Sequence, residues 1–591
     1  MRLTLPSTRM PDPLDDLLPR FSRAIETAFG AEHAGADPVL RRSAQPKFGD
    51  YQANGAMALA KTLGRNPREV ASAIVEHLDL AGLAEAPEVA GPGFVNIRLL
   101  PDYLGAKAAE LAGDDRLGVR PAPVAETVVV DYSQPNVAKE MHVGHLRSTI
   151  IGDAVVRVLE FLGHRVIRQN HLGDWGTNFG MLIEHVGDLG EDEATAELSL
   201  GDLEAFYRQA KAKFDADPSF AERARLRVVA LQSGDPATLA HWRLLIDLST
   251  RYFSTVYELL GVRLTDDDIA GESFYNPMLA DVADDLVDKG LAVVDEGALC
   301  VFPPGFAGRD GKPFPLMVRK SDGGFGYDAT DLAALRYRVS ELGADRIIYV
   351  VDARQSQHFA LLFKAGEMAG WLGAGTRAEH VAFGAVLGPD GRPFKTRAGG
   401  TVRLVALLRE AVERAEAVVA ERGGLDEATR AEVARQVGVG AVKYADLSND
   451  RSKDYVFDLD RMLAMDGNTG PYLQYAHVRT RSIARKAAEQ GVAPAAGTAV
   501  LVTEPAERAL VLQLLALDCV VHATSEALQP HRLTTYLFEL ASAFTAFFDQ
   551  CPVLRADTPG QRASRLVLTD LTGQTLRLGL DLLGIEAPER M

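Results

Sequence analysis

The sequence predicts an α/β protein built around a doubly wound parallel sheet, with a small α/β domain before it and an all-α bundle after it. Between residues 126 and 387, short apolar segments alternate with amphipathic stretches, which is typical of such a sheet. From Val402 onward, apolar residues recur almost only at helical spacing. The 591 residues exceed what one hydrophobic core holds, since domains commonly span roughly 100–200 residues. We therefore expect several domains.

The first domain is expected over residues 1–120. Helical spacing of apolar residues between Leu14 and Phe29, and a strand-like piece over Gly93–Arg98, indicate a small α/β unit. Two prolines between residues 118 and 126 then indicate a linker.

The central domain is expected over residues 121–400. Four apolar runs predict its strands: Thr127–Val130, Arg165–Arg168, Arg346–Val351 and His380–Val386. A charged, helix-rich insertion with a hairpin is expected over about 191–316. Residues 401–591 should be helical, and about 451–591 should form a bundle.

The charge composition narrows the range of possible binding functions. Basic and acidic residues number 63 and 81, so 63 − 81 gives a net charge of −18, which argues against a generic binder of polyanions. A local patch remains, because residues 467–488 contain no Asp or Glu but several arginines and aromatics; a solvated helix face is the alternative.

Location and metal content follow from what the sequence lacks. The N-terminus has no apolar signal core and no long uninterrupted apolar run occurs, so we expect a cytoplasmic protein without a membrane segment. Cys300, Cys519 and Cys551 are scattered, so neither a disulfide framework nor a tightly bound metal is expected.

A turn with two histidines follows the first predicted strand. After His142-Val-Gly-His145 the apolar residues adopt helical spacing, so both imidazoles should lie at a helix N-terminus. Backbone N–H groups and the helix dipole favour an anion there, and Gly144 would let it approach the backbone. We expect nucleotide phosphates; two surface histidines are the alternative reading.

The residues around this turn resemble a known family. DYSQPNVAKEMHVGHLRST, followed by HLGDWGTNFGMLIEH, is similar to the signature of class I aminoacyl-tRNA synthetases, specifically of the arginyl-tRNA synthetases. The resemblance covers essentially the whole chain and implies a Rossmann-type nucleotide-binding core. It implies a monomer that activates L-arginine with ATP and Mg²⁺ and transfers it to the terminal ribose of tRNA(Arg), with activation waiting for bound tRNA.

The chain departs from the class pattern in its lysine loop. Where the class carries Lys-Met-Ser-Lys-Ser, this chain has GPDGRPFKTRAGG, so Lys395 and Arg397 are the remaining candidates. In similar bacterial synthetases a lysine just before the histidine motif replaces the missing one, and Lys139 occupies that position. The resulting ATP site comprises Lys139, His142, Gly144, His145 and His358. For His358 a structural role is the alternative.

Selection of arginine requires carboxylates, because a guanidinium is a planar fork that bidentate acceptors satisfy. Asp131, at the end of the first strand, and Asp331, near Tyr327, are the candidates, although Asp331 could instead cap a helix. By resemblance, Asn136 and Gln355 hold the α-amino and carboxylate end. The complete expected arginine site is Asp131, Ser133, Asn136, Tyr327, Asp331 and Gln355.

Two further regions resemble the tRNA-binding parts of the family. KFGDYQANGAM and GFVNIRL are similar to its appended N-terminal domain, and AMDGNTGPYLQYAHVRTRSIARK with the terminal LGIEAPERM to its anticodon-binding bundle. Aromatic and arginine side chains suit unstacked bases. The expected tRNA contacts are Phe94, Asn96, Tyr472, Tyr475, Arg479, Arg481 and Met591.

Two other function classes compete. A non-tRNA nucleotidyltransferase also uses an HxGH turn, but would lack the aromatic and arginine-rich helical tail. A catalytically silent tRNA-binding paralogue could keep both tails, but Lys139, His142 and His145 are all present. Cysteine specificity is disfavoured, since the sequence shows no zinc-ligand cluster.

Overall fold

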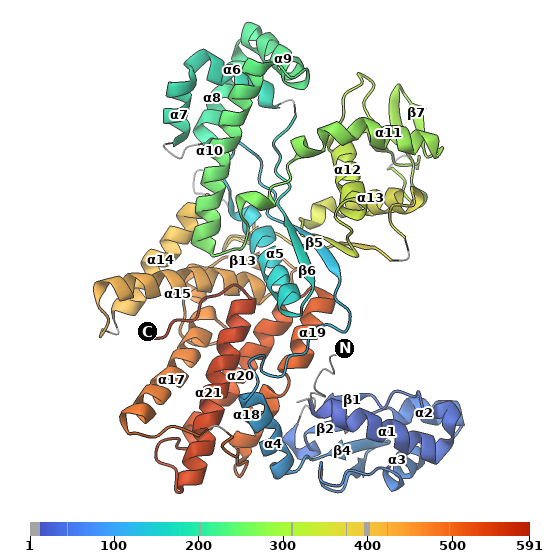
Figure 1. Cartoon of the computed structure of the whole chain (residues 1–591), viewed down its shortest axis with the longest axis vertical. Coiled ribbons are helices and arrows are strands. Elements are labelled where there is room, and N and C mark those ends of the chain that lie inside the picture. The colour runs from blue at the N-terminus through green and yellow to red at the C-terminus, as the bar shows by residue number, and fades with distance from the viewer. Residues whose placement is uncertain are drawn as a thin grey trace, which may run out of the picture.

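The computed structural model describes residues 12–591 except 44, 177, 200–202, 309–310, 374, 395–401, 422 and 496. Its parts are stacked along one long axis: helical insertion at one end, parallel sheet in the middle, helical bundle and N-terminal domain at the other (Figure 1). The fold class matches the sequence prediction.

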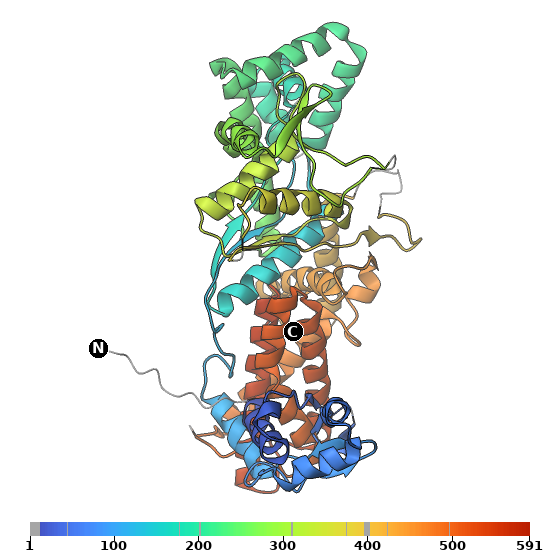
Figure 2. The ribbon, with the colours of Figure 1, turned by 90° about the vertical axis from the view of Figure 1, so that its right-hand side faces the viewer.

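The N-terminal domain packs helices on an antiparallel sheet of order β1-β2-β4-β3. Asp12 caps α1 through the backbone N–H of Leu14, and Leu17, Phe21 and Ile25 bury its apolar stripe. The elements of this domain are α1 (Pro13–Phe29), β1 (Leu40–Arg42), β2 (Tyr51–Ala53), α2 (Ala56–Leu63), α3 (Pro67–Glu76), β3 (Glu88–Ala90), β4 (Phe94–Ile97) and α4 (Pro101–Ala112). Figure 2 shows this domain, in blue, against the lower end of the bundle, where α4 packs on α18 (Pro505–Leu514) and α21 (Pro559–Leu582).

The central sheet has four parallel strands in the order β11-β10-β5-β6. β5 and β10 belong to different halves of the chain and lie side by side, with Asp131 opposite Tyr349. The order therefore reverses between them, and ligands of such sheets bind beyond the carboxyl ends of strands at this point. The elements are β5 (Thr127–Asp131), α5 (Val143–Phe161), β6 (Arg165–Gln169), α12 (Tyr327–Ser340), β10 (Arg346–Tyr349), α13 (Ser356–Met368) and β11 (Arg377–His380).

The expected strand over His380–Val386 is wrong in its extent. β11 ends at His380, and a separate short strand, β12 (Val386–Leu387), pairs with β13 (Tyr455–Val456) in another sheet. Between them the chain passes through Gly384, whose close approach to Lys453 leaves no room for a Cβ. The apolar residues of this segment thus serve two sheets.

The insertion has a helical part and a small sheet, separated in Figure 1 at the upper left and upper right. The helices are α6 (Asn178–Leu189), α7 (Glu191–Ser199), α8 (Leu203–Ala216), α9 (Pro218–Gln232), α10 (Pro236–Leu260) and α11 (Leu279–Asp288). The expected hairpin is β7 (Ala292–Asp295) with β8 (Ala298–Val301), and β9 (Leu316–Arg319) extends it to three antiparallel strands.

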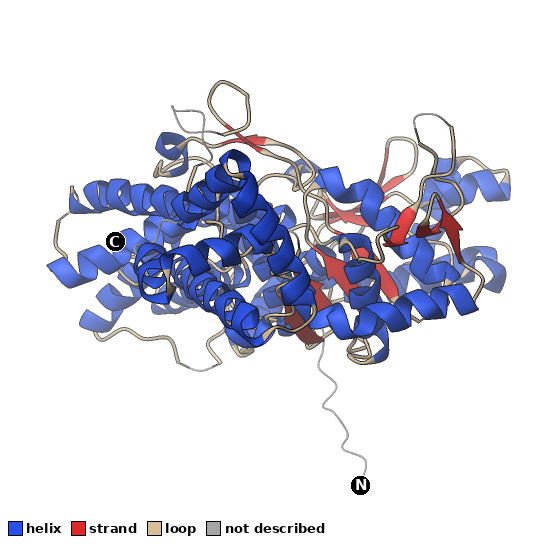
Figure 3. Ribbon diagram, turned by 90° about the horizontal axis from the view of Figure 1, so that it is seen from above, coloured by secondary structure: helices blue, strands red, loops and turns tan. Residues whose placement is uncertain are grey.

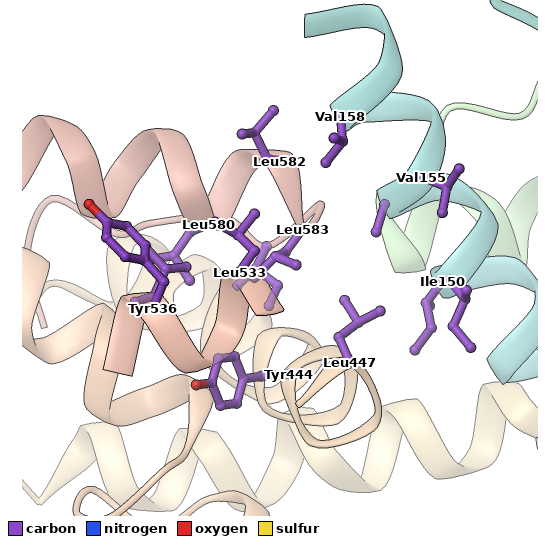
Figure 4. Close-up of a cluster of buried hydrophobic side chains, with 14 of the residues drawn as sticks. Ile150, Val155, Val158, Tyr444, Leu447, Leu533, Tyr536, Leu580, Leu582 and Leu583 are labelled. Atoms are coloured by element: carbon purple, nitrogen blue, oxygen red, sulfur yellow. The ribbon is translucent and has the colours of Figure 1, made fainter. Parts of the chain in front are cut away.

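The C-terminal region is helical, as Figure 3 shows by colour, apart from the β12–β13 ladder among the described residues. Its helices are α14 (Leu404–Ala420), α15 (Glu427–Leu447), α16 (Leu459–Met462), α17 (Gly470–Glu489), α18, α19 (Leu517–Ala527), α20 (His531–Gln550) and α21. Buried side chains of α5, including Ile150, Val155 and Val158, face α15, α20 and α21 (Figure 4). The helix after the histidine turn is therefore packed into the joint between sheet and bundle.

The segment Pro505–Ala527 is long and apolar enough to cross a membrane by composition alone, with a mean hydropathy of 1.4. It is broken into α18 and α19 at Leu515 and Ala516, and both helices pack against α20. Its apolar residues form part of the bundle core.

Candidate functional site

The HVGH turn is a helix cap made from its own two histidines. His142 is the N-cap of α5, and its Nδ1 accepts a hydrogen bond of 3.0 Å from the N–H of Gly144. Nδ1 of His145 accepts one of 3.1 Å from the N–H of His142. The ring centroids are 4.0 Å apart. Because the Nδ1 of each ring accepts a backbone hydrogen bond, Nε2 is the ring nitrogen that carries a proton and can donate it.

Gly144 is required by this geometry. A Cβ at position 144 would lie 2.7 Å from Cε1 and 2.8 Å from Nδ1 of His142. The glycine therefore makes room for the imidazole of its neighbour, a role that its place in an anion-binding turn did not reveal.

His145 stays neutral at physiological pH. Burial, followed by the charge of His142, lowers its pKa to about 3. It therefore offers a neutral hydrogen-bond donor, so positive charge for a polyphosphate must come from another residue.

Lys139 is held beside the insertion. Its ammonium lies 4.7 Å from the ring centroid of Tyr207 on α8, a favourable cation–π distance. The loop before it is strained, because Ser133, Gln134 and Ala138 have φ values of 75°, 54° and 57°, which non-glycine residues rarely adopt. Such strain clusters at functional sites.

The expected arginine residues of the first half differ in accessibility. Asp131 is buried, and its Oδ2 accepts a 2.6 Å hydrogen bond from Arg338. Ser133 is also buried and lies 2.7 Å from the Tyr257 hydroxyl. Asn136 is exposed and bridges to Gly173. The Asp131 carboxylate thus supports the pocket through an internal arginine.

The expected residues of the second half meet at the start of α12 and α13. Tyr327 and Asp331 lie one turn apart on α12, and Nε2 of His358 is 2.6 Å from Oδ2 of Asp331. Nδ1 of His358 is 3.3 Å from Oδ1 of Asp328. Gln355 precedes α13 and is exposed. His358 therefore lies between two carboxylates, and its expected place in the ATP site stays a prediction.

This histidine is a charged partner. Burial opposes its charge, but hydrogen bonds to Asp328 and Asp331 outweigh that cost and raise its pKa to about 9. Burial alone would raise the pKa of Asp331, yet the hydrogen bond from His358 holds it below its usual value. Asp331 is therefore ionised at neutral pH.

Glu272 is a further carboxylate of this region that the sequence did not predict. Burial, then the charges of Asp174 and Asp331, raises the pKa of Glu272 to about 7. Asp174 itself accepts hydrogen bonds from Ser273, which follows Glu272. Three acids that lie far apart in the sequence thus share one region, and a cation would relieve their mutual repulsion. The sequence feature that pointed to this region was the DW pair in HLGDWG. Its Asp174 binds Ser273 and so holds the segment that carries Glu272.

The expected tRNA residues lie on two separate domains. Phe94 and Asn96 lie two residues apart on β4 and therefore on one face of that strand. Asn96 accepts a hydrogen bond of 2.8 Å from Gln52. On α17, the Arg479 guanidinium lies 5.1 Å from the Tyr475 ring and 5.0 Å from the Phe548 ring. The others on or near this helix make internal contacts: Tyr472 with Phe538, Arg481 with Glu589, and Met591 with the core.

Lys395 and Arg397 lie outside the described residues. The residues on both sides of that segment are placed. Before it, Phe394 stacks on Phe457 with centroids 5.2 Å apart. After it, Arg403 bridges to His142. Over the part of the chain that the structure describes, no group of three or more His, Cys, Asp or Glu is arranged to hold a metal ion.

Comparisons with known proteins agree along the whole chain. Residues 109–459 match the family model "tRNA synthetases class I (R), catalytic domain", residues 15–99 match "Arginyl tRNA synthetase N terminal domain", and residues 473–591 match "DALR anticodon binding domain". The chain is similar to the arginine–tRNA ligases of Thermobifida fusca, at 57% identity over 98% of this chain and 100% of that one, and of Synechococcus elongatus, at 52% over 98% and 100%.

Solved structures agree as well. The crystal structure of arginyl-tRNA synthetase from Plasmodium falciparum is 30% identical with a TM-score of 0.83, covering 99% of this chain and 100% of that one. The arginyl-tRNA synthetase of Thermus thermophilus is 28% identical with a TM-score of 0.78, covering 96% and 99%.

Proposed function

The chain belongs to the arginyl-tRNA synthetase family, and from this premise we infer that it is an arginine–tRNA ligase. It activates L-arginine with ATP to arginyl-adenylate and pyrophosphate, then esterifies tRNA(Arg). The observation that supports this function is the presence of two features in one fold: a helix N-terminus capped by two histidines after β5, and three carboxylates that interact with one another. A non-tRNA nucleotidyltransferase needs the first but has no use for the second.

In the activation step the arginine carboxylate attacks the α-phosphorus of ATP, a P–O bond forms, and the bond to pyrophosphate breaks. Catalysis then consists of positioning and charge stabilisation. Nε2–H groups of His142 and His145 are suited to hydrogen-bond the phosphates, with Gly144 keeping the first ring in place. Lys139 would supply the positive charge, and Lys395 and Arg397 remain further candidates.

Mg²⁺ would enter with ATP, bound by phosphate oxygens and water as is usual for nucleotide-bound magnesium. Its charge would lower the electrostatic cost of the phosphorane-like transition state. The protein's own contribution is to hold the ATP phosphates at the histidine turn.

We assign the guanidinium of arginine to Asp331 and Glu272, whose carboxyl groups interact electrostatically, with Tyr327 next to Asp331. Asp331 is held ionised by His358, and bound substrate would give Glu272 a cationic partner. A bidentate fork can contact both carboxylates, whereas a lysine ammonium offers one point charge. Asn136, Gln355 and the Ser133 loop would take the amino-acid end, and Asp131 supports the site through Arg338.

Transfer RNA would contact both ends of the molecule: the N-terminal domain through Phe94 and Asn96, and the bundle through Tyr472, Tyr475, Arg479, Arg481 and Met591. We further propose that the enzyme acts as a cytoplasmic monomer and that activation requires bound tRNA.

Aminoacylation of total tRNA with each labelled amino acid tests the function. Only arginine should be incorporated, and periodate-treated tRNA, which lacks the terminal diol, should accept none. Incorporation of another amino acid would refute arginine specificity. Binding of tRNA without any charging would favour the silent paralogue.

A further inference from the structure

One buried arginine joins four segments of the chain around the histidine turn. Arg147 lies on α5, five residues after His142, and is 1% exposed. Its Nη1 donates hydrogen bonds of 2.8 Å to the carbonyl of Gly384 and 2.9 Å to that of Lys453. Its Nε lies 3.2 Å from Oδ2 of Asp446 on α15. These partners lie 237 to 306 residues away in the sequence.

The carbonyls that Arg147 binds belong to a backbone ladder. The N–H of Gly384 donates to Arg451 and that of Phe457 donates to Leu387, with distances of 2.9 and 2.8 Å. The β12–β13 pair lies between these two bonds. This ladder fixes the chain that leads from the second half of the sheet toward Phe394.

The strands of the ladder are packed too closely to move toward each other without a clash. A Cβ on Gly384 would lie 2.7 Å from the Lys453 carbonyl carbon and 2.5 Å from Oδ1 of Asp454. The Arg147 guanidinium also lies 5.3 Å from the ring centroid of Tyr455 in β13. The ladder and α5 are therefore held at one separation.

On the other side, the same turn is tied to the chain that follows. The N–H of Val143 donates to Val402 with a distance of 3.1 Å, and that of Leu404 donates to Met141 with 2.9 Å. The histidine turn is thus bracketed by two stretches of the second half of the chain. Arg147 is the side chain whose fork reaches across to the first stretch.

We propose that Arg147 is a positioning residue for arginine activation: its guanidinium sets the β12–β13 ladder against the helix that carries His142 and His145. ATP in a doubly wound sheet binds across both halves, so a shift between them misplaces phosphates held at the turn. Lysine keeps the charge at this position but cannot donate to three acceptors along fixed directions. This proposal rests on the proposed activation chemistry.

The test compares Arg147→Lys with Arg565→Lys. Arg565 forms a buried pair of the same kind in the bundle, with Nε 2.7 Å from Glu507 and Nη1 3.1 Å from the Pro552 carbonyl. Arginine-dependent ATP–pyrophosphate exchange with saturating tRNA gives kcat and the KM for ATP. Calorimetric titration gives arginine affinity, and circular dichroism gives Tm.

We expect Arg147→Lys to lower kcat about 10- to 100-fold, since small misplacements of reacting groups cost about that much, while arginine affinity changes less than about twofold. Arg565→Lys should lower Tm at least as much but keep kcat. Equal effects of both variants on kcat, or none from Arg147→Lys, would overturn the proposal.

A second variant covers a folding failure of the first. Gly384→Ala leaves Arg147 intact and pushes the ladder away from Lys453 and Asp454, so it should show the same loss of kcat with arginine affinity retained. Unchanged kcat in a folded Gly384→Ala protein would contradict the proposal. If instead the wild-type protein shows no arginine-dependent exchange, the proposed function fails and not the positioning role.

Discussion

We expect the titration of Glu272 to make arginine binding depend on pH, which the titration of its neighbour Asp331 would not do. Its pKa of about 7 leaves the carboxyl about nine-tenths ionised at about pH 8 and about one-tenth at about pH 6. His358, with a pKa of about 9, keeps its charge over this interval, and Asp331 stays ionised because its pKa is lowered. If the guanidinium needs the Glu272 carboxylate, the KM for arginine should rise about tenfold as the pH falls from about 8 to about 6.

The same group gives a stability effect of opposite sign. The pKa in the folded protein lies above the ordinary value of 4.5, so the folded state holds this proton more tightly than the unfolded state. The resulting stability is fully present below about 4.5 and is lost as pH rises through about 7. At about pH 8 the buried charge lowers the free energy of unfolding by up to about 3 kcal/mol. Glu272→Gln should therefore raise Tm at about pH 8 while weakening arginine binding.

The wild type and Glu272→Gln are compared between about pH 6 and 8. Calorimetry gives arginine affinity, ATP–pyrophosphate exchange gives the KM for arginine, and thermal unfolding gives the Tm of both proteins. The variant should lose the tenfold rise, because a carboxamide does not titrate. Glu296→Gln, the same change on the exposed β7–β8 turn, is the matched control and should behave as the wild type. The reasoning is refuted if Glu272→Gln keeps the wild-type pH profile, or if it binds arginine as tightly at about pH 8.

Three other changes test the nucleotide side of the site. Tyr207→Leu removes the cation–π partner of Lys139 and should change the kcat of ATP–pyrophosphate exchange severalfold, with arginine affinity unaltered. Tyr207→Phe keeps the ring and should leave kcat unchanged. Equal behaviour of the two variants would contradict a role for this contact. Gly144→Ala forces the His142 ring out of place and should raise the KM for ATP about tenfold or more, while Gly375→Ala, with open space around the added methyl group, should change nothing. Omission of tRNA should leave ATP–pyrophosphate exchange near background, and brisk exchange without it would disprove the tRNA requirement.

Local patterns predicted the parts of the site that are continuous in sequence. The β5 strand, the HVGH turn and α5 follow one another directly, so apolar spacing and helix-cap chemistry were enough to place His142 and His145. Tyr327 and Asp331 were grouped because they lie close in the sequence. Both lie on α12, which begins at Tyr327, so Asp331 is inside that helix and is not its cap. In these cases the sequence distance is short and the periodicity of one element decides the outcome.

Tertiary partners were not predictable in this way. Asp131 was expected to face the substrate as an open acid, but Arg338, 207 residues away, occupies one of its oxygens. Glu272 lies in a short 3₁₀ segment with no periodic pattern, and its pKa is raised by burial and then by the charges of Asp174 and Asp331 from two other regions. A carboxylate's environment is set by whichever segments fold against it, and a single sequence carries no record of those contacts.

The helix α5 shows why the catalytic and tRNA-binding regions of this chain cannot be treated as separate modules. Its first turn carries the histidines, and its far half is tied to other regions: Nε of Arg157 is 2.7 Å from Asp153, and Nη2 donates to Gly261 at the end of α10 with a distance of 2.9 Å. Arg157 also contacts Asp581 on α21. The same helix therefore contacts the end of α10 and α21 near its C-terminus and carries the HVGH turn at its N-terminus. Asp153 is buried and accepts hydrogen bonds from Arg157 and from the N–H of Arg263, so we expect a substitution that moves α21 to shift the HVGH turn as well.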